Sequence, residues 1–582
     1  MSTAASVRID RSGDALRIAD RVTGQMYALG VPTSASSTDP VERTDEFPAP
    51  VDRTVTLSTD RIDLPEPMFC WLHDADGELI HAIEEDPFRG DLSGPAGGFL
   101  ELSTLVKTYL RFEEPFAVRG GADGFHVDLG GRAQVTVGAR AWHCYPEATI
   151  RIDERPRDLM AAVSRFGSSL RTTSPERAYP TLRGHPPAVR VGDGTAFPDG
   201  VTEPDTDVEL VVPPDPASIC AVAPLAYYLP ATLTPGDRFA VRCGDEEFVP
   251  PGADVASAAA AVLRHCFTLD CFVRSAGIYP TEVVQRRRFE ETAAVDLDYA
   301  ALYEASPAER TARYLRVPFE AVAPHVPPWP TTVVVPPTVR AAEALPGFVV
   351  QLATVRAADP PRHTGAAART RVARAFAGDG TPTRATGVGR DLAAPVVEVP
   401  ASDSRRTVWA GDGIPLNAVA FRLAGRRHRY DRATAPRTET TGTSVAVVCN
   451  DASMAGESEG VPEPLESRPD LEADYSLHRR TTTAQLRRII ERETDYLHFI
   501  GHATAEGLEC VDGRLDVADV DHSGVRLFCL NACRSFRQGG TARRAGQRRR
   551  HRDRRRRGLP AGRRDRPRRR HPAGRGGCRS VA

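Results

Sequence analysis

The sequence contains a single lysine, Lys107, so arginine supplies almost all of its 75 basic residues. A Walker A loop ends in Gly-Lys-Ser/Thr, but Lys107 follows Val106, which excludes that phosphate-binding motif. The serine-nucleophile motif G-x-S-x-G and the zinc motif H-E-x-x-H are absent as well. The motifs of three large enzyme classes are therefore missing, and the sequence suggests no bound nucleotide cofactor.

Cysteine pairs and long apolar runs are also lacking. The 11 cysteines are scattered and none forms a C-x-x-C pair, which argues for a reducing compartment over a disulfide framework. His265, Cys266 and Cys271 have poor spacing for zinc, so we expect no metal site and no cofactor. Apolar runs such as 258–263 fall far short of about 20 residues, and residues 1–10 do not resemble a signal peptide. These features predict a soluble, cytoplasmic protein with no membrane partner.

Charge is divided unequally along the chain. Residues 541–582 hold 18 arginines and two aspartates, whereas residues 1–540 hold 57 basic and 75 acidic residues, a net charge of −18. An acidic body of this kind is typical of a halophilic protein, because high salt screens its self-repulsion. A GC-rich genome favours arginine codons but does not explain the −18. The basic tail has no aromatic residue for base stacking, so we do not expect nucleic acid to be the main partner.

Changes in the hydrophobic and turn pattern along the sequence predict a multidomain protein. Short alternating segments bounded by turns predict a β-rich N-terminal region, and mixed helical and strand patterns follow it. The proline-dense stretch 323–337 is predicted to be a stiff connector or an edge strand. The predicted regions are a β-rich domain of unknown function (1–155), a mixed α/β domain (156–335), a linker or small accessory region (336–440), a parallel α/β domain (441–540) and a disordered arginine-rich tail (541–582).

From residue 442 onward, apolar strands alternate with a helix. The helix is predicted at 482–493, where Thr482 and Gln485 have the spacing of a capping box. Strand, helix, strand and strand at this spacing indicate a parallel α/β sheet. The predicted strands are 445–449, 475–478, 496–500 and 525–530.

A histidine and a cysteine follow two of these strands. His502 comes two residues after 496–500, and Cys533 comes three residues after 525–530. If the two strands are neighbours, both side chains emerge at the carboxyl edge of the sheet, where sites form in such folds. A cysteine nucleophile needs an adjacent imidazole as its base, and that imidazole then protonates the leaving amine. Gly501, Ala503 and Ala532 are small and leave room for a substrate beside the backbone.

The segments DYLHFIGHA (495–503), VDGRL (511–515) and LFCLNACRS (527–535) resemble the CHAT domain, a family of caspase-like cysteine peptidases. The resemblance covers about 442–537 and implies a caspase-like fold, a parallel sheet flanked by helices. It implies that His502 is the catalytic histidine, that Cys533 is the nucleophile, and that the backbone N–H groups of Ala503 and Cys533 form the oxyanion hole. It also implies a protein or peptide substrate, no metal, and control by upstream sensor domains or a regulatory protein partner.

The sequence departs from the family after the nucleophile. CHAT domains continue well past it, whereas here the recognisable pattern stops near 537–540 and the arginine-rich tail begins. Of the 42 residues in 541–582, 32 are Arg, Gly, Ala or Pro, the composition of a GC-rich gene read in a shifted frame. We therefore expect an incomplete peptidase domain with impaired turnover. The alternatives are a catalytically dead pseudopeptidase that acts as a binding or scaffold protein, and electrostatic nucleic-acid binding through the tail.

Overall fold

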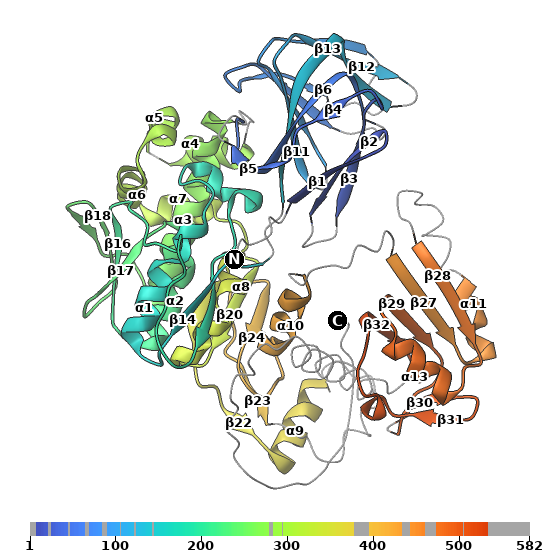
Figure 1. Ribbon diagram of the computed structural model, residues 1–582. Coiled ribbons are helices and arrows are strands. Elements are labelled where there is room, and N and C mark those ends of the chain that lie inside the picture. The colour runs from blue at the N-terminus through green and yellow to red at the C-terminus, as the bar shows by residue number, and fades with distance from the viewer. Residues whose placement is uncertain are drawn as a thin grey trace. The chain divides into compact units, whose positions relative to one another are not determined.

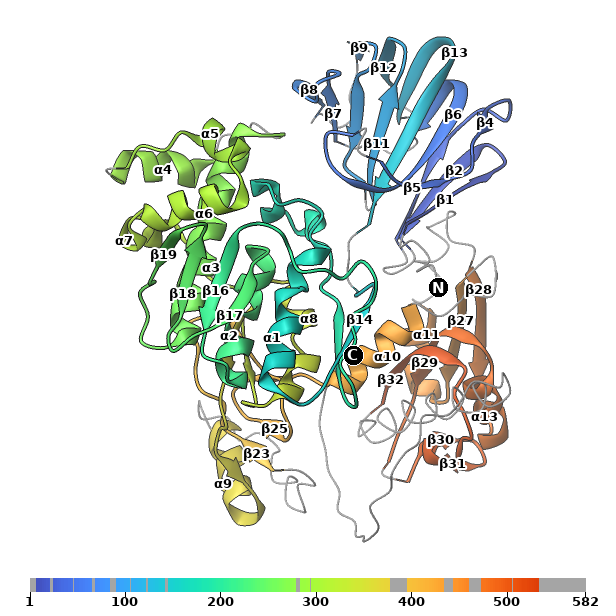
Figure 2. The same cartoon turned by 60° about the vertical axis from the view of Figure 1, so that its left-hand side comes forward.

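A computed structural model gives the fold of the chain (Figures 1 and 2). The chain forms two compact units, residues 1–362 with 397–435 and residues 363–396 with 436–582. Cys533 and the basic tail lie outside the described residues. The described residues are 7–20, 25–44, 47–64, 69–83, 90–104, 106–121, 124–141, 145–278, 283–293, 295–376, 395–433, 443–459, 473–504 and 506–532.

The predicted β-rich N-terminal region is confirmed as an antiparallel sheet of 13 strands. Its main path is β1-β2-β3-β6-β13-β11-β10-β7-β8, and the long strands β6 and β13 form its centre. Alternating residues of these strands form one continuous apolar core. The strands are β1 (Val7–Ser12), β2 (Ala15–Asp20), β3 (Met26–Gly30), β4 (Ser36–Ser37), β5 (Val41–Thr44), β6 (Val51–Leu64), β7 (Cys70–His73), β8 (Leu79–Ile83), β9 (Gly90–Gly94), β10 (Phe99–Leu102), β11 (Lys107–Phe112), β12 (Phe116–Gly121) and β13 (Gly124–Arg140).

A mixed α/β region follows, in which small sheets surround buried helices. Strands β14 and β15 pair in parallel, and a second sheet has the order β17-β16-β18-β19. The helices α2 and α3 pack together in the core, and the side chain of Asp254 caps the start of α3. The elements are β14 (Thr149–Ile152), α1 (Pro156–Ser164), β15 (Ala188–Val191), β16 (Val208–Val212), α2 (Pro216–Tyr228), β17 (Thr232–Pro235), β18 (Ala240–Cys243), β19 (Glu246–Phe248), α3 (Val255–Val273), α4 (Val284–Thr292), α5 (Tyr299–Glu304), α6 (Pro307–Arg316) and α7 (Phe319–Val322).

Helix α3, with the turn that follows it to Ala276, is long and apolar enough to cross a membrane by length and composition. However, 56% of its apolar window is buried inside the protein, and core helices of soluble proteins pass the same test. Its Asp270 is fully buried and accepts hydrogen bonds from Tyr228 (2.7 Å), Tyr314 (2.9 Å) and Arg177 (2.9 Å). These contacts are those of a core helix, and the cytoplasmic location stays a prediction.

A parallel sheet, which we call the first parallel sheet, has the order β21-β20-β24-β26. The expectation that 323–337 is a connector or an edge strand is wrong, because β20 is buried and paired on both sides. Pro330 and Pro336 lie just outside β20, so neither removes a ladder hydrogen bond. Residues 336–440, expected to be a linker or accessory region, supply the other three strands. The elements are β20 (Thr331–Val335), α8 (Pro346–Val349), β21 (Thr354–Ala357), β22 (Arg362–His363), α9 (Gly365–Phe376), β23 (Val396–Val397), β24 (Arg406–Trp409), β25 (Ile414–Pro415), β26 (Val419–Ala420) and α10 (Leu423–Ala433).

The predicted C-terminal parallel sheet is confirmed, with the order β28-β27-β29-β32 (Figure 1). We call it the second parallel sheet. Leu486 and Ile490 of α13 pack on Leu497 and Phe499 of the sheet, and the predicted Thr482–Gln485 capping box is present. The elements are β27 (Thr443–Cys449), α11 (Ala455–Glu459), β28 (Ala473–Arg479), α13 (Thr483–Glu491), β29 (Thr494–Ile500), β30 (Leu508–Cys510), β31 (Gly513–Leu515) and β32 (Val525–Asn531).

Candidate functional site

The strand order of the second parallel sheet reverses between β27 and β29. The chain runs from β27 to its neighbour β28 on one side and then crosses to β29 on the other side. Connections leave the carboxyl ends of these two strands in opposite directions, and open parallel sheets bind ligands at such a point. The two strands end level with each other, since Cys449 pairs in register with Ile500. Residues directly after Cys449 and Ile500 therefore line the expected site.

Asp451 and His502 meet at this reversal of the strand order. The Nε2 atom of His502 lies 2.6 Å from Oδ2 of Asp451, a contact between residues 51 positions apart in the sequence. The Asp451 side chain is 20% exposed and that of His502 is 57% exposed, so the pair faces solvent on the histidine side. This is the arrangement of an oriented imidazole that a substrate can reach.

Asp451 is held as a carboxylate. Its Oδ1 atom accepts hydrogen bonds from the hydroxyl and the backbone N–H of Ser453, both at 2.8 Å. These bonds, together with the contact from His502, hold the pKa of Asp451 below its ordinary value of 3.8. Asp451 is therefore ionised at neutral pH and favours a proton on the facing nitrogen of His502.

The backbone around His502 is fixed on two sides. On the sheet side, the N–H of Gly501 donates to the carbonyl of Asn531 at 3.2 Å. On the other side, the N–H of Glu509 donates to the carbonyl of His502 at 2.9 Å, and the N–H of Thr504 donates to Gly507 at 2.9 Å. His502 thus sits on a short antiparallel ladder that joins the end of β29 to the hairpin β30–β31.

Ala503, one of the two predicted oxyanion-hole positions, lies within this ladder. It is 6% exposed and forms an isolated bridge with Leu508. The ladder bonds flank that bridge at His502 and Thr504, so Ala503 and Leu508 are the non-hydrogen-bonded pair. In such a pair the N–H points away from the partner strand. The N–H of Ala503 is therefore not used by the hairpin, as an oxyanion donor requires.

Gly507 lets the ladder close at its turn. Its φ is +154°, and a Cβ atom placed on it would lie 2.5 Å from the backbone carbon and oxygen of Leu515. Only glycine fits this approach between the turn and β31. The hairpin position that supports His502 therefore depends on a residue without a side chain.

Cys533, the predicted nucleophile, lies outside the described residues, but the strand that leads to it is described. The condition on which the sequence expectation depends is met, since the strands that precede His502 and Cys533 are neighbours: β29 pairs in parallel with β32. Ile500 is in register with Asn531, so His502 and Cys533 each follow a register pair by two residues. Neighbouring strands lie about 4.8 Å apart, so Asn531, two residues before Cys533, lies beside Ile500, two residues before His502.

Asn531, at the carboxyl end of β32, connects this edge to another element. Its side-chain amide donates to the carboxylate of Glu457 on α11, the helix that follows β27. Asn531 is thereby bound to the helix that follows β27. The segment that precedes Cys533 is anchored by this bond and by the backbone contact with Gly501.

Sequence reasoning identified His502 but missed Asp451, Asn450 and Glu457. Asn450 and Asp451 directly follow the predicted strand 445–449. Their position directly after a buried strand was the available signal, because polar residues there reach the carboxyl edge. Which histidine they meet depends on strand order and register, which the sequence pattern does not specify.

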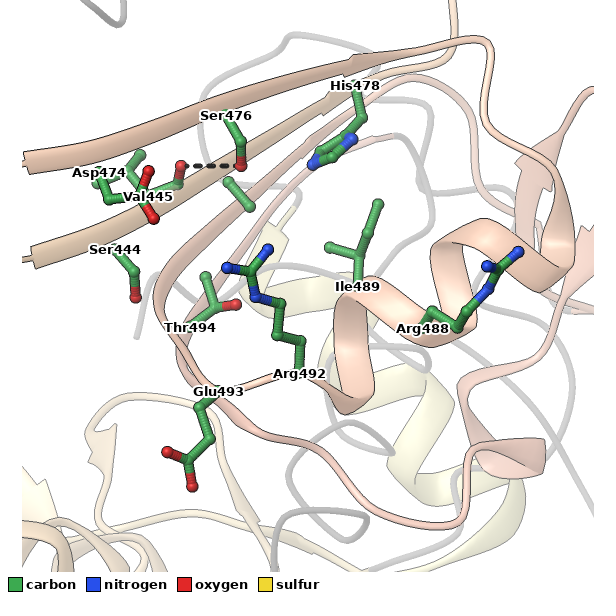
Figure 3. A pocket seen from close by; sticks show the side chains of 11 residues that line it. Ser444, Val445, Asp474, Ser476, His478, Arg488, Ile489, Arg492, Glu493 and Thr494 are labelled. Carbon is green, nitrogen blue, oxygen red and sulfur yellow. Dashed lines mark hydrogen bonds between the residues drawn. The ribbon is translucent and has the colours of Figure 1, made fainter. Parts of the chain in front are cut away.

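A cavity of about 190 Å³ lies between α13 and the same sheet and extends from the starts of β27 and β29 to His478 near the end of β28 (Figure 3). Arg492 and Ile489 approach it from the α13 side, and Asp474, Ser476 and His478 approach it from alternate positions of β28. The lining includes Ser444 and Thr494 near the starts of β27 and β29, whereas Asp451 and His502 follow the ends of these strands. The cavity is therefore separate from the candidate catalytic pair.

The residues considered for zinc binding lie in the core of the other unit. Burial lowers the pKa of His265 to about 4, and its Nε2 atom lies 2.7 Å from the carbonyl oxygen of Tyr314. Cys266 is fully buried in the same apolar core. Among the described residues, no group of three or more His, Cys, Asp or Glu side chains is placed to hold a metal ion.

The whole chain was compared with known proteins, and no family model, no curated protein and no solved structure matches it.

Proposed function

We propose that the second parallel sheet carries a cysteine peptidase site, in which Cys533 is the nucleophile, His502 the acid–base residue and Asp451 the group that orients His502. The observation that carries this proposal is the 2.6 Å contact between Asp451 and His502 at the point where the strand order reverses. The register of β29 and β32 supports it, because Asn531, two residues before Cys533, pairs with Ile500, two residues before His502.

The contact with Asp451 assigns the two nitrogens of the imidazole different roles. Nε2–H donates to the Asp451 carboxylate, which leaves Nδ1 as the proton acceptor. Nδ1 takes the proton of the Cys533 thiol, and the resulting thiolate attacks the carbonyl carbon of the scissile peptide bond. The anionic Asp451 stabilises the imidazolium that forms.

The remaining steps return the proton and release both products. The tetrahedral oxyanion receives hydrogen bonds from the N–H groups of Ala503 and Cys533. Protonated His502 gives its proton to the leaving amine as the C–N bond breaks, which leaves a thioester on Cys533. A water molecule, deprotonated by His502, then attacks the thioester and restores the thiol.

The proposed substrate is a segment of a protein, cleaved within the chain. The half-exposed side chain of His502 is open to such a segment. The β-rich N-terminal region and the mixed α/β region are proposed to bind a regulatory partner and control the site. The proposal names no metal or cofactor, because the proton transfers above involve only side chains and water.

Cleavage of a fluorogenic peptide library by the full chain, in buffers from low to high salt, tests this function. We expect Cys533→Ala to lower turnover by at least about 10³-fold, because the nucleophile is removed. Cys529→Ala is the matched control, since Cys529 lies on β32 but is not part of the proposed chemistry. Equal turnover by wild type and Cys533→Ala would contradict the proposal, and a folded wild type without turnover at any salt concentration would favour the scaffold alternative.

A further inference from the structure

The end of β27 carries a second polar residue, Asn450, directly before Asp451. We infer that Asn450 is a positioning residue for His502, acting through the hairpin β30–β31. The inference deepens the proposed function, on which its catalytic meaning rests, while its structural part rests on hydrogen bonds of the described residues alone. Asn450 holds His502 through its side chain and Asp451 through its backbone N–H.

Asn450 uses three of the four hydrogen-bonding positions of its amide. Its Oδ1 atom accepts from the backbone N–H of Thr481 at 2.8 Å and from the Thr481 hydroxyl at 2.9 Å. Its Nδ2 atom donates to the carbonyl of Glu509 at 3.0 Å. The backbone N–H of Asn450 donates to the carbonyl of Ile500, also at 3.0 Å. Asn450 therefore joins β27, β29, the start of α13 and β30.

The path from Asn450 to His502 runs through a single residue, Glu509. The carbonyl of Glu509 accepts from Asn450, and its N–H donates to the carbonyl of His502 at 2.9 Å. In an extended strand the N–H and C=O of one residue point to the same side. Both bonds of Glu509 thus face the site, and a shift of Glu509 moves the backbone of His502 directly.

The backbone of the same residue fixes the other member of the pair. Asp451 is the next residue along the chain, and the bond between the Asn450 N–H and Ile500 sets where the backbone leaves β27. A catalytic pair must be held within a fraction of an ångström to transfer protons efficiently. Asn450 meets this requirement, because its backbone N–H binds the end of β27 to the end of β29 and its side-chain amide binds the end of β27 to the hairpin.

Bonds that bypass Asn450 hold the hairpin to α13. The N–H of Val511 donates to the carbonyl of Thr481 at 3.1 Å, and Asp512 accepts from the N–H and hydroxyl of Thr483 at 2.7 and 3.1 Å. Loss of the Asn450 amide should therefore leave the hairpin folded and loosen only its hold on His502. This separation allows a positioning role to be distinguished from a general structural one.

Asn450→Ala tests the inference, with Thr481→Ala as the matched control. The first variant removes the bond to Glu509, whereas the second removes one hydroxyl bond to Asn450 and leaves Glu509 in place. By amide hydrogen exchange, we expect Asn450→Ala to speed exchange at the Glu509 N–H by about tenfold or more, and Thr481→Ala by less than about threefold. By NMR titration, we expect the pKa of Asp451 to rise in Asn450→Ala only, because the His502 donor moves away while the Ser453 donors stay.

The outcomes separate this inference from the proposed function. Unchanged exchange at Glu509 in Asn450→Ala, or equal changes in both variants, would overturn the positioning role whether or not the chain cleaves peptides. A faster exchange with a raised Asp451 pKa would support it even if no substrate is found. If turnover is measurable, a fall in kcat with little change in KM for Asn450→Ala supports the role in catalysis, and unchanged kcat contradicts it.

Discussion

The first and second parallel sheets have the same strand order relative to the chain. In each sheet, counted in chain order, the second strand pairs with one side of the first strand and the third strand pairs with its other side. The fourth strand pairs with the third, and all pairs are parallel. The point where the order reverses lies between β20 and β24 in the first sheet, and between β27 and β29 in the second. By topology alone, each sheet offers an equivalent crevice.

The residues at the two crevices differ in kind. Pro336 and Pro337 follow β20, where Asn450 and Asp451 follow β27. A proline supplies no N–H and no polar side-chain group. The same fold thus contains one edge that lacks polar side chains after its first strand and one that carries an amide and a carboxylate.

The loops after the third strands differ as well. After β24, the guanidinium of Arg422 donates to the carbonyl of Gly413 at 3.0 Å, and Nε1 of Trp409 donates to the carbonyl of Asp412 at 3.0 Å. After β29, the imidazole of His502 is half exposed, and its ion-pair partner is the carboxylate of Asp451. The first loop is closed by structural bonds and the second presents an imidazole beside a carboxylate, so the proposed function depends on the residues at the edge rather than on the fold.

The largest expected effect comes from removing the imidazole itself. His502→Ala should lower kcat/KM for peptide cleavage by about 10³-fold or more, because both proton transfers lose their carrier. Asp412→Ala at the corresponding loop of the first sheet should change it by less than about twofold, since only the Asp412 backbone makes the contact with Trp409. Steady-state kinetics on both variants measures the difference. Similar losses in the two variants would remove the functional contrast between the sheets.

The next effect concerns Asp451. Asp451→Asn should lower kcat by about 10- to 100-fold, because the amide neither fixes the tautomer of His502 nor stabilises its charged form. Since the pKa of Asp451 is held below 3.8, the carboxylate contributes fully above that value, and its contribution is lost as pH falls through its lowered pKa. A kcat–pH profile tests both statements. An unchanged kcat in Asp451→Asn at neutral pH would show that the contact has no catalytic role.

A smaller effect is expected at Arg422, the residue that closes the corresponding loop of the first sheet. Arg422→Ala should lower the free energy of unfolding by about 1 kcal/mol, because Arg422 is exposed and its bonds to the loop are partly screened. Peptide cleavage should be unaffected at temperatures where the variant is folded. Denaturant unfolding and kinetics measured in parallel would reveal an error if activity fell while stability did not.

The smallest effect is a pKa change at Asp451. Ser453→Ala should raise the pKa of Asp451, since the Ser453 hydroxyl is the strongest cause of its lowering, while the backbone N–H of Ser453 remains. NMR titration of the labelled carboxyl group measures the change. A pKa that stays where it was would mean that the backbone N–H and His502 alone hold Asp451 ionised.

Much of the second sheet could be predicted from its sequence. Continuous apolar runs gave β27, β29 and β32 to within two residues, and the Thr482–Gln485 pattern located the start of α13. Local chemistry determines both signals. His502 could be predicted for the same reason, because its position after a buried strand is visible in the sequence.

Two features depended on tertiary pairing and could not be predicted. The proline-dense segment around β20 suggested an edge strand, yet its prolines flank five buried residues that two neighbours cover. The contact between Asp451 and His502 depends on the pairing of Cys449 with Ile500, which brings together residues that are distant along the chain. Strand order and register are properties of the assembled sheet, so neither appears in a local pattern.

The proposed function requires that His502 activate Cys533. The pH dependence of cysteine alkylation is the sharpest test of this step. The labelled site is identified by peptide mapping in wild type and His502→Ala, with Cys529 as the internal reference on the same strand. We expect Cys533 to react with the alkylating reagent well below the pH of about 8.5 at which an unassisted thiol ionises. In His502→Ala, we expect the pH at which Cys533 reacts to return to about 8.5. Identical profiles for Cys533 in the two proteins would contradict the account.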